Sequence, residues 1–209
     1  MGTHLHGKKN FCNVRVSNIS FYYTNARSIR NKIPEFKTYI GIYKPEIVGI
    51  TESWLSDMDL DDLFDDIGYS IIRLDRKDRK GGGILILIKF GIEYYICDDL
   101  CCQSGLHFEA VCLQITFGHF AFKLCICYRT GPDDDESLVY PLISEVGKTK
   151  SLIMGDFNIP DIDWEQHTAS STIGQRFLDT LQDNFLFQNT LECTRGKKYI
   201  GFNTDCWWT

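Results

Sequence analysis

Two long β-rich stretches, residues 108–116 and 120–128, are separated by only Phe117, Gly118 and His119. A connection of three residues that contains glycine predicts a β-hairpin, because strands joined so tightly must pair antiparallel. The fold must therefore contain at least one sheet built around an antiparallel pair.

Shorter runs of apolar and β-branched residues on either side of this hairpin predict five further strands. They lie at residues 19–23, 46–51, 69–74, 84–90 and 151–154. Apolar residues at a spacing near 3.6 predict three helices, at residues 28–43, 137–146 and 172–184. Pro34 fits the first turn of the first helix if that helix begins near Lys32. Because helix-separated strands come first and hairpins follow, the order favours a mixed α/β sandwich of two sheets with helices outside.

The chain of 209 residues is long enough for one domain with a substantial core. We expect residues 1–18 to be an extension with a possible first strand, and residues 19–209 to form the domain. No apolar run approaches the roughly 18 residues that a membrane span needs, and the start lacks the apolar region of a secretory signal. These features favour an intracellular protein without a membrane partner.

The nine cysteines are an odd number, and none belongs to a CxxC pair. We therefore expect reduced thiols rather than disulfides, and the ligand spacing of known zinc modules is missing. The net charge of −6 counts against a nucleic-acid partner, since such proteins usually carry a basic surface. The acids, however, are concentrated at residues 57–66 and 133–136, so a locally positive face can exist elsewhere.

Four of the predicted strands end in polar side chains that suit a metal ion or a phosphate. Asn25 follows one strand, Glu52 follows the next, and Tyr128 ends the hairpin. Asp156 and Asn158 end the strand at 151–154 and, being two residues apart on an extended chain, point the same way. Ligands of α/β sheets lie at the carboxyl ends of strands, and a carboxylate there can hold Mg²⁺.

Each of these motifs taken alone has a plain structural explanation. Glu52 is then an exposed residue at a strand end, Asn25 belongs to an ordinary helix N-cap region, and Tyr128 is an aromatic at a sheet rim. The sequence Gly155-Asp156-Phe157-Asn158 can be an Asx-turn, although Gly155 would also let the backbone approach a ligand closely. The combination of the four motifs is what favours a functional site.

The order Asn, Glu, Tyr, Asp-x-Asn resembles that of the endonuclease/exonuclease/phosphatase superfamily, which includes exonuclease III, apurinic endonucleases and DNase I. The surrounding sequence is similar to the endonuclease domains of LINE-type (non-LTR) retrotransposons, especially the chicken-repeat-like clades. The resemblance extends over about residues 19–196. Its segments are YTNARSIRNK, EIVGITESWL, DRKDRKGGGILILIK, FEAVCLQI, CICYRTGP, SLIMGDFNIPDIDW and LECTRG.

The resemblance implies a four-layer α/β (α+β) sandwich, with two packed mixed β-sheets flanked by helices. It also implies an Mg²⁺- or Mn²⁺-dependent enzyme that nicks DNA and leaves a 3′-hydroxyl to prime reverse transcription. Glu52 would hold the metal with Asn25 close by, and Asp156 would orient or deprotonate the attacking water. Asn158 would fix the phosphate and that aspartate, and Tyr128 would donate to a phosphate oxygen.

Further residues match motifs of the same family. Thr194 and Arg195 match a region that contacts the DNA backbone, and arginine suits phosphate. Glu109 matches a glutamate of a middle strand; the resemblance gives it no definite role, and an exposed position at the packing edge is the alternative. Gly81-Gly82-Gly83 precedes a strand rather than a helix, which favours a flexible turn over a nucleotide-binding loop.

The sequence departs from the family after residues 194–196. It reads KKYIGFNTDCWWT where the family continues to a Ser-Asp-His motif, His167 does not match that histidine, and no role is carried over to Asp205. We therefore expect a domain truncated at its C-terminus before the final strands, with turnover lowered about 10²- to 10⁴-fold by loss of the Asp-His pair.

Two alternatives remain open. The chain could be a catalytically dead remnant with at most nucleic-acid binding, or a phospholipid or phosphoinositide phosphoesterase of the same fold. Under the family resemblance we expect DNA as partner, a reverse transcriptase domain as a further candidate partner in the parent element, a monomer, and a nuclear location.

Overall fold

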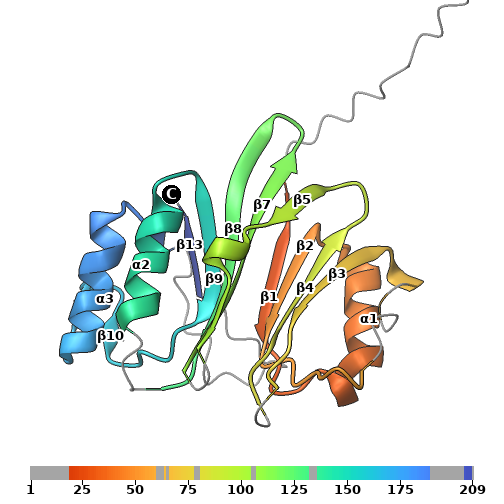
Figure 1. Ribbon diagram of the computed structural model, residues 1–209, viewed down its shortest axis with the longest axis horizontal. Helices are drawn as coiled ribbons and strands as arrows, with labels where there is room; N and C mark the ends of the chain where they lie inside the picture. Colours follow the sequence, from red (N-terminus) through yellow and green to blue (C-terminus); the bar gives the residue numbers. More distant parts are fainter. Residues whose placement is uncertain are drawn as a thin grey trace, which may run out of the picture.

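Two β-sheets pack face to face in the computed structural model, and helices cover the outer face of each sheet (Figure 1). The structure describes residues 19–59, 64, 66–77, 81–104, 107–131, 136–188 and 205–208. The predicted four-layer α/β sandwich is thus confirmed, while the predictions for residues 1–18 lie outside the described residues. None of the described helices is long and apolar enough to cross a membrane.

The first sheet has the strand order β1-β2-β4-β3. Its strands are β1 (Phe21–Asn25), β2 (Ile47–Thr51), β3 (Tyr69–Leu74) and β4 (Ile84–Lys89). Only β1 and β2 pair in parallel, because α1 (Ile33–Tyr43) carries the chain back between them. A short 3-10 turn, η1 (Arg30–Lys32), precedes α1, whose first turn contains Pro34. The helix thus begins next to Lys32, as the position of Pro34 predicted, and residues 28–32 of the apolar spacing are not part of it.

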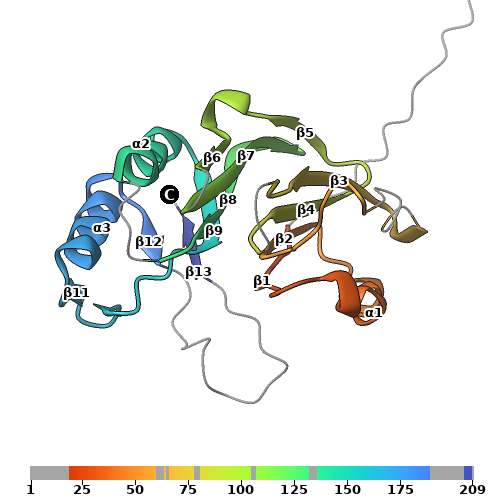
Figure 2. The same ribbon diagram turned by 60° about the horizontal axis from the view of Figure 1, so that its bottom comes forward.

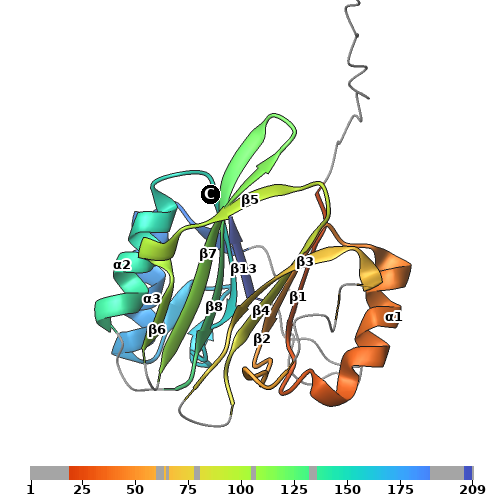
Figure 3. The same cartoon turned by 45° about the vertical axis from the view of Figure 1, so that its right-hand side comes forward.

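The second sheet has the order β12-β13-β9-β8-β7-β5, and β6 pairs with β7. Its strands are β5 (Glu93–Ile96), β6 (Cys102–Ser104), β7 (Phe108–Phe117), β8 (Phe120–Arg129), β9 (Ser151–Asp156), β12 (Phe187–Gln188) and β13 (Asp205–Trp208). The turn η3 (Asp98–Leu100) joins β5 to β6. The predicted hairpin is formed by β7 and β8, and it extends beyond the neighbouring strands (Figure 3).

Two helices cover the outer face of the second sheet (Figure 2). They are α2 (Glu136–Gly147), which connects the parallel strands β8 and β9, and α3 (Thr172–Asp183). A small antiparallel pair, β10 (Ile162–Asp163) and β11 (Thr168–Ala169), precedes α3. The Ser171 side chain caps α3 by accepting the Gly174 N–H at 2.9 Å.

The apolar core is divided into three clusters by the sheets. Strand β7 shows why, because its successive side chains point to opposite faces. Val111 and Leu113 belong to the cluster between the two sheets, whereas Ala110 and Cys112 belong to the cluster under α2 and α3. A third cluster packs α1 against the first sheet. Strands buried on both faces read as continuous apolar runs, which is the pattern that the sequence shows.

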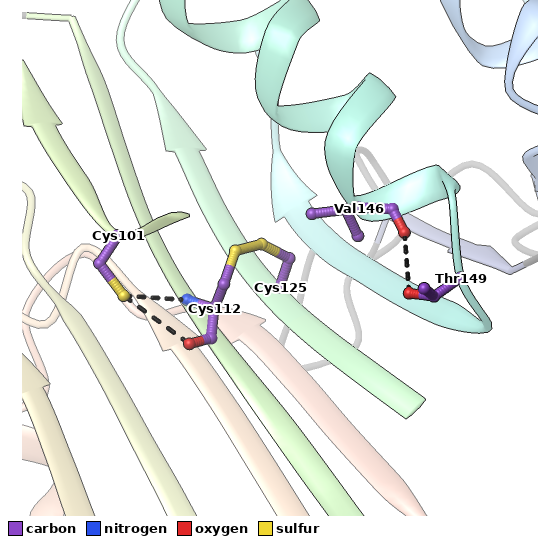
Figure 4. Close-up of a disulfide and its surroundings, with 5 residues drawn as sticks. All are labelled: Cys101, Cys112, Cys125, Val146 and Thr149. Atoms are coloured by element: carbon purple, nitrogen blue, oxygen red, sulfur yellow. Dashed lines mark hydrogen bonds between the residues drawn. A yellow bond between two sulfur atoms is a disulfide. The ribbon is translucent and has the colours of Figure 1, made fainter. Parts of the chain in front are cut away.

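Cys112 and Cys125 form a disulfide between β7 and β8 (Figure 4). The hairpin register places the two residues directly opposite each other, with Cα atoms 4.3 Å apart. The expectation that the cysteines are all reduced is therefore wrong for this pair. Cysteine spacing alone did not reveal it, because the pairing follows from the register that the turn at Gly118 and His119 sets. The free cysteines in the described residues are Cys97, Cys101, Cys102 and Cys127.

Candidate active site

Strands β1 and β2 deliver the first two polar groups side by side. Their parallel register pairs Asn25 with Thr51, so that Asn25 lies next to Glu52. Glu52 leaves the strand with a φ of 52°, a left-handed conformation that non-glycine residues rarely adopt. Backbone hydrogen bonds hold this turn, since the Ser28 N–H donates to the Glu52 carbonyl at 2.8 Å.

Strands β8 and β9 deliver the second pair in the same way. Tyr128 and Asp156 are register partners in this parallel pair, and both are nearly fully buried. Gly155 lets the two strands approach each other, because a Cβ atom there would lie 2.4 Å from the Cys127 carbonyl oxygen. The backbone of β8 therefore needs the space at Gly155, while the interpretation that Gly155 serves close approach to a ligand stays a prediction.

Hydrogen bonds join the two pairs across the sandwich. The Asn25 amide donates to Glu52 Oε1 at 2.9 Å and to Asp156 Oδ2 at 2.9 Å. The Tyr128 hydroxyl donates to the same Glu52 oxygen at 2.8 Å. The structure thus brings together all four strand-end residues, two from each sheet, around one point.

Asn158 lies at the same place and supports the aspartate. Its backbone N–H donates to Asp156 Oδ1 at 3.2 Å, and its side-chain amide donates to the Arg129 carbonyl. A φ of 49° at Asn158 turns the chain sharply after β9. Asparagine tolerates this left-handed conformation better than most residues.

These five residues line one pocket of about 540 Å³. Two arginines, Arg27 and Arg129, also line it, and Ile159, Pro160 and Ile173 form an apolar wall beside the acids. Arg129 is buried and donates to the Phe157 carbonyl at 3.1 Å, whereas Arg27 is exposed. With Asp161, which also lines it, the pocket therefore combines three carboxylates with two guanidinium groups.

Sequence reasoning gave Arg27 no role. Its φ of 44° and the hydrogen bond from its N–H to Asn25 Oδ1, 3.3 Å long, turn the chain at the pocket. The available signal was a basic residue two positions after the strand-end Asn25. That signal is weak without the fold, because it does not show on which side of the turn the side chain lies.

The Tyr128 phenol stays protonated over the physiological range. Burial raises its pKa strongly, and the neighbouring negative charges of Glu52 and Asp156 raise it further. The positive charge of Arg76 lowers the pKa by a smaller amount. Tyr128 is therefore a hydrogen-bond donor in this site. The pKa of Asp161, which also lines the pocket, is lowered because Ser171 donates hydrogen bonds to its carboxylate.

Glu109 lies outside this pocket. Its side chain is fully buried in β7 and pairs with Arg76 through a 2.6 Å contact, so the alternative of an exposed packing edge is wrong. Thr194 and Arg195 lie outside the described residues, and nothing in the structure bears on their predicted contact with DNA.

The donor atoms of the site suit a hard cation. Glu52 and Asp156 are both linked to Asn25, so two carboxylates and an amide converge there. Within the described ranges, no group of three or more histidine, cysteine, aspartate or glutamate residues could hold a metal ion. Mg²⁺ keeps several waters and often binds only one or two carboxylates together with a substrate phosphate. The residues present therefore fit an open Mg²⁺ site rather than a closed cage.

The chain is similar to known proteins in structure and not in sequence. No protein-family model and no curated protein matches the sequence. The endonuclease domain of TRAS1, a telomere-specific non-LTR retrotransposon, is similar with a TM-score of 0.65 and 14% identity, covering 92% of this chain and 85% of that one. An AP endonuclease from Archaeoglobus fulgidus has a TM-score of 0.57 and 13% identity, covering 91% and 86%.

A third similar structure is an endonuclease/exonuclease/phosphatase family protein from Bacteroides thetaiotaomicron. It has a TM-score of 0.57 and 13% identity, covering 91% of this chain and 82% of that one. Identities this low carry information on the fold alone. The chain therefore has the endonuclease/exonuclease/phosphatase (DNase I-like) fold, as the sequence resemblance implied.

Proposed function

We propose that this protein is a metal-dependent phosphodiesterase that nicks DNA. The observation that carries the proposal is the hydrogen-bonded cluster of Asn25, Glu52, Tyr128 and Asp156, built from both sheets inside one pocket. A carboxylate pair, an amide and a protonated phenol are the groups that hydrolysis of a phosphodiester needs for metal binding, water activation and charge stabilisation.

Each residue has a role that follows from its position. Glu52 would hold Mg²⁺ or Mn²⁺, and a bound ion would supply charge stabilisation to the phosphoryl group and to the leaving 3′-oxygen. Asp156 orients a water molecule and accepts its proton, and the Asn158 N–H fixes the orientation of that carboxylate. Tyr128 turns its hydroxyl proton from Glu52 to a phosphate oxygen as negative charge develops there.

The two arginines of the pocket favour a phosphate substrate. Arg27 is exposed at the rim, where its guanidinium can bind the phosphate next to the scissile one. Arg27 thus supplies a positive group at the rim of the pocket, and the net charge of −6 counts less against DNA because DNA contacts only one face. The similarity to a retrotransposon endonuclease and to an AP endonuclease supports DNA as the polymer.

A plasmid-nicking assay tests the proposal. Supercoiled DNA is incubated with Mg²⁺ and wild-type protein, Glu52→Ala or Asp156→Ala, and Glu46→Ala is the matched control. Glu46 and Glu52 flank opposite ends of β2, so the control removes the same type of side chain from the same strand, far from the pocket.

We expect nicking by the wild type and the control, and none above background by the two site variants. Equal activity of all four proteins, including no activity at all, would overturn the enzyme proposal in favour of a catalytically dead domain. Release of phosphate from an inositol phosphate without nicking would instead favour the phosphoinositide alternative.

A further inference from the structure

A buried ion pair links the two sheets directly behind the candidate active site. Arg76 follows β3 of the first sheet, and Glu109 lies in β7 of the second. Arg76 Nε donates to Glu109 Oε1 at 2.6 Å, and the two side chains are only 7% and 0% exposed. Neither residue is among those that line the pocket.

The second oxygen of Glu109 holds the glycine-rich turn before β4. The Gly83 N–H donates to Glu109 Oε2 at 2.8 Å. The carbonyl groups of the same turn accept from the chain that follows Glu52, since Ser53 N–H donates to Gly83 at 3.2 Å and Trp54 N–H donates to Gly82 at 3.1 Å. A continuous path of hydrogen bonds thus runs from Glu109 through the turn to the residue after Glu52.

The glycines of this turn make the path sterically feasible. Their φ values of 68° at Gly82 and 85° at Gly83 are left-handed. A Cβ atom at Gly82 would lie 2.3 Å from the Arg76 guanidinium carbon, and one at Gly83 would lie 2.7 Å from Ser53 Oγ. The triplet therefore gives Arg76 and Ser53 room to pack against the turn, which accounts for a motif that the catalytic cluster leaves unexplained.

We propose that Arg76 and Glu109 are positioning residues that keep Glu52 in its metal-binding orientation. Glu52 and Trp54 both have left-handed φ values, 52° and 55°, and such conformations persist only where the surrounding structure holds them. The path through Gly83 and Ser53 supplies that restraint on one side of Glu52.

A contribution to folding stability does not explain the presence of this ion pair. Buried ion pairs are often no better for folding than apolar residues of similar volume. Among the described residues, the buried Arg76 NH2 group also lacks a hydrogen-bond partner, which is a cost that an apolar pair would avoid. Retention of a buried pair at this position is explained if it orients the metal-binding glutamate.

The test rests on the proposed function and measures Mn²⁺ binding, followed by the electron paramagnetic resonance signal of the free ion. Wild-type protein is compared with Glu52→Ala, with Glu109→Gln, and with the double variant Arg76→Met/Glu109→Leu. Tyr69→Phe is the stability control, because it removes a buried hydrogen bond to the Pro45 carbonyl away from the pocket. Thermal unfolding of every protein is recorded alongside.

We expect Glu52→Ala to abolish tight Mn²⁺ binding, and Glu109→Gln to weaken it by roughly 10- to 100-fold, as loss of a group that orients a metal ligand does. The double variant is decisive. It leaves no unpaired buried charge, so it should unfold at a higher temperature than Glu109→Gln, yet it lacks an acceptor for the Gly83 N–H and should bind Mn²⁺ as weakly as Glu109→Gln. Tyr69→Phe should unfold at a lower temperature with unchanged Mn²⁺ affinity.

Wild-type Mn²⁺ affinity in the double variant would overturn the positioning inference while leaving the metal site intact. Equal binding by wild type and Glu52→Ala, or none by either, would instead overturn the proposed function and this inference with it. If Glu109→Gln does not fold, the double variant carries the test by itself, since it also removes the acceptor of the Gly83 N–H and the same weakening is expected.

Discussion

The Gly155→Ala substitution should damage both stability and activity, although it adds only one methyl group. Gly155 and Cys127 are register partners in the parallel pair of β9 and β8, and each directly precedes a residue of the candidate site. The added Cβ would lie 2.4 Å from the Cys127 oxygen and 3.0 Å from its carbonyl carbon. Both atoms belong to the backbone, so no side chain can rotate away.

The size of the effect follows from this distance. Ordinary contacts of a Cβ atom begin near 3.4 Å, so the strands must separate by about 1 Å. Overpacking of a buried position costs about 1–3 kcal/mol, and a rigid backbone contact places this case at the upper end. A displacement of about 1 Å between Tyr128 and Asp156 should lower the nicking rate roughly 10²-fold.

Gly49→Ala is the matched control. Gly49 is also a buried strand glycine, but the atom nearest to its added Cβ is Ile126 Cδ1, at 2.7 Å, which is the end of a flexible side chain. The gain of roughly 0.5–1 kcal/mol from replacing glycine in a strand should offset most of this clash. Urea unfolding and plasmid nicking are measured for both variants, and a Gly155→Ala protein as stable and active as Gly49→Ala would refute the reasoning.

Three further variants test individual groups. Asn25→Asp replaces the donor shared by Glu52 and Asp156 with a third carboxylate, so the variant should unfold at a lower temperature than the wild type without Mg²⁺. Added Mg²⁺ should raise the unfolding temperature of the variant more than that of the wild type, which thermal scans measure. Tyr128→Phe should lower nicking roughly 10²-fold with little change in unfolding temperature, because it removes a donor to developing charge. Burial raises the pKa of Glu46, but hydrogen bonds from Ser20 and Lys89 outweigh burial, so the pKa in the folded protein is lowered. The Glu46 carboxylate therefore stabilises the fold at a pH above its pKa in the unfolded chain. This stabilisation is lost as the pH falls through the pKa of the folded protein. Glu46→Gln should therefore destabilise the protein at neutral pH and lose that effect in acid, and an unchanged difference in urea unfolding across this range would contradict the assignment.

Much of the fold could be predicted because its central strands are buried on both faces. The run at 84–90 has no polar interruption until its end, and β4 occupies nearly the same residues. Strand β5 was missed for the opposite reason. It lies at the sheet edge and has only four residues, most of them exposed, so its short sequence Glu-Tyr-Tyr-Ile gives a weaker signal than the long buried runs.

The candidate site was predictable only as a set of strand ends. Asn25, Glu52, Tyr128 and Asp156 each stand where an apolar run stops, which the sequence shows directly. Which oxygen accepts which donor depends on how the two sheets are aligned. The pair of Arg76 with Glu109 illustrates the limit, since these residues lie 33 positions apart and meet only because the sheets pack face to face.

Three of the links across the sandwich show a common structural cause. Asn25 with Asp156, Tyr128 with Glu52, and Glu109 with Gly83 each join a residue of one sheet to a residue of the other. The distances among these groups are therefore set by the apolar cluster between the sheets rather than by any single loop. Packed interiors resist small displacements, so this cluster holds the polar groups in a fixed geometry without a ligand. The geometry of the candidate site therefore depends on the packing of the core, and a change in the spacing of the sheets would change the distances among the polar groups.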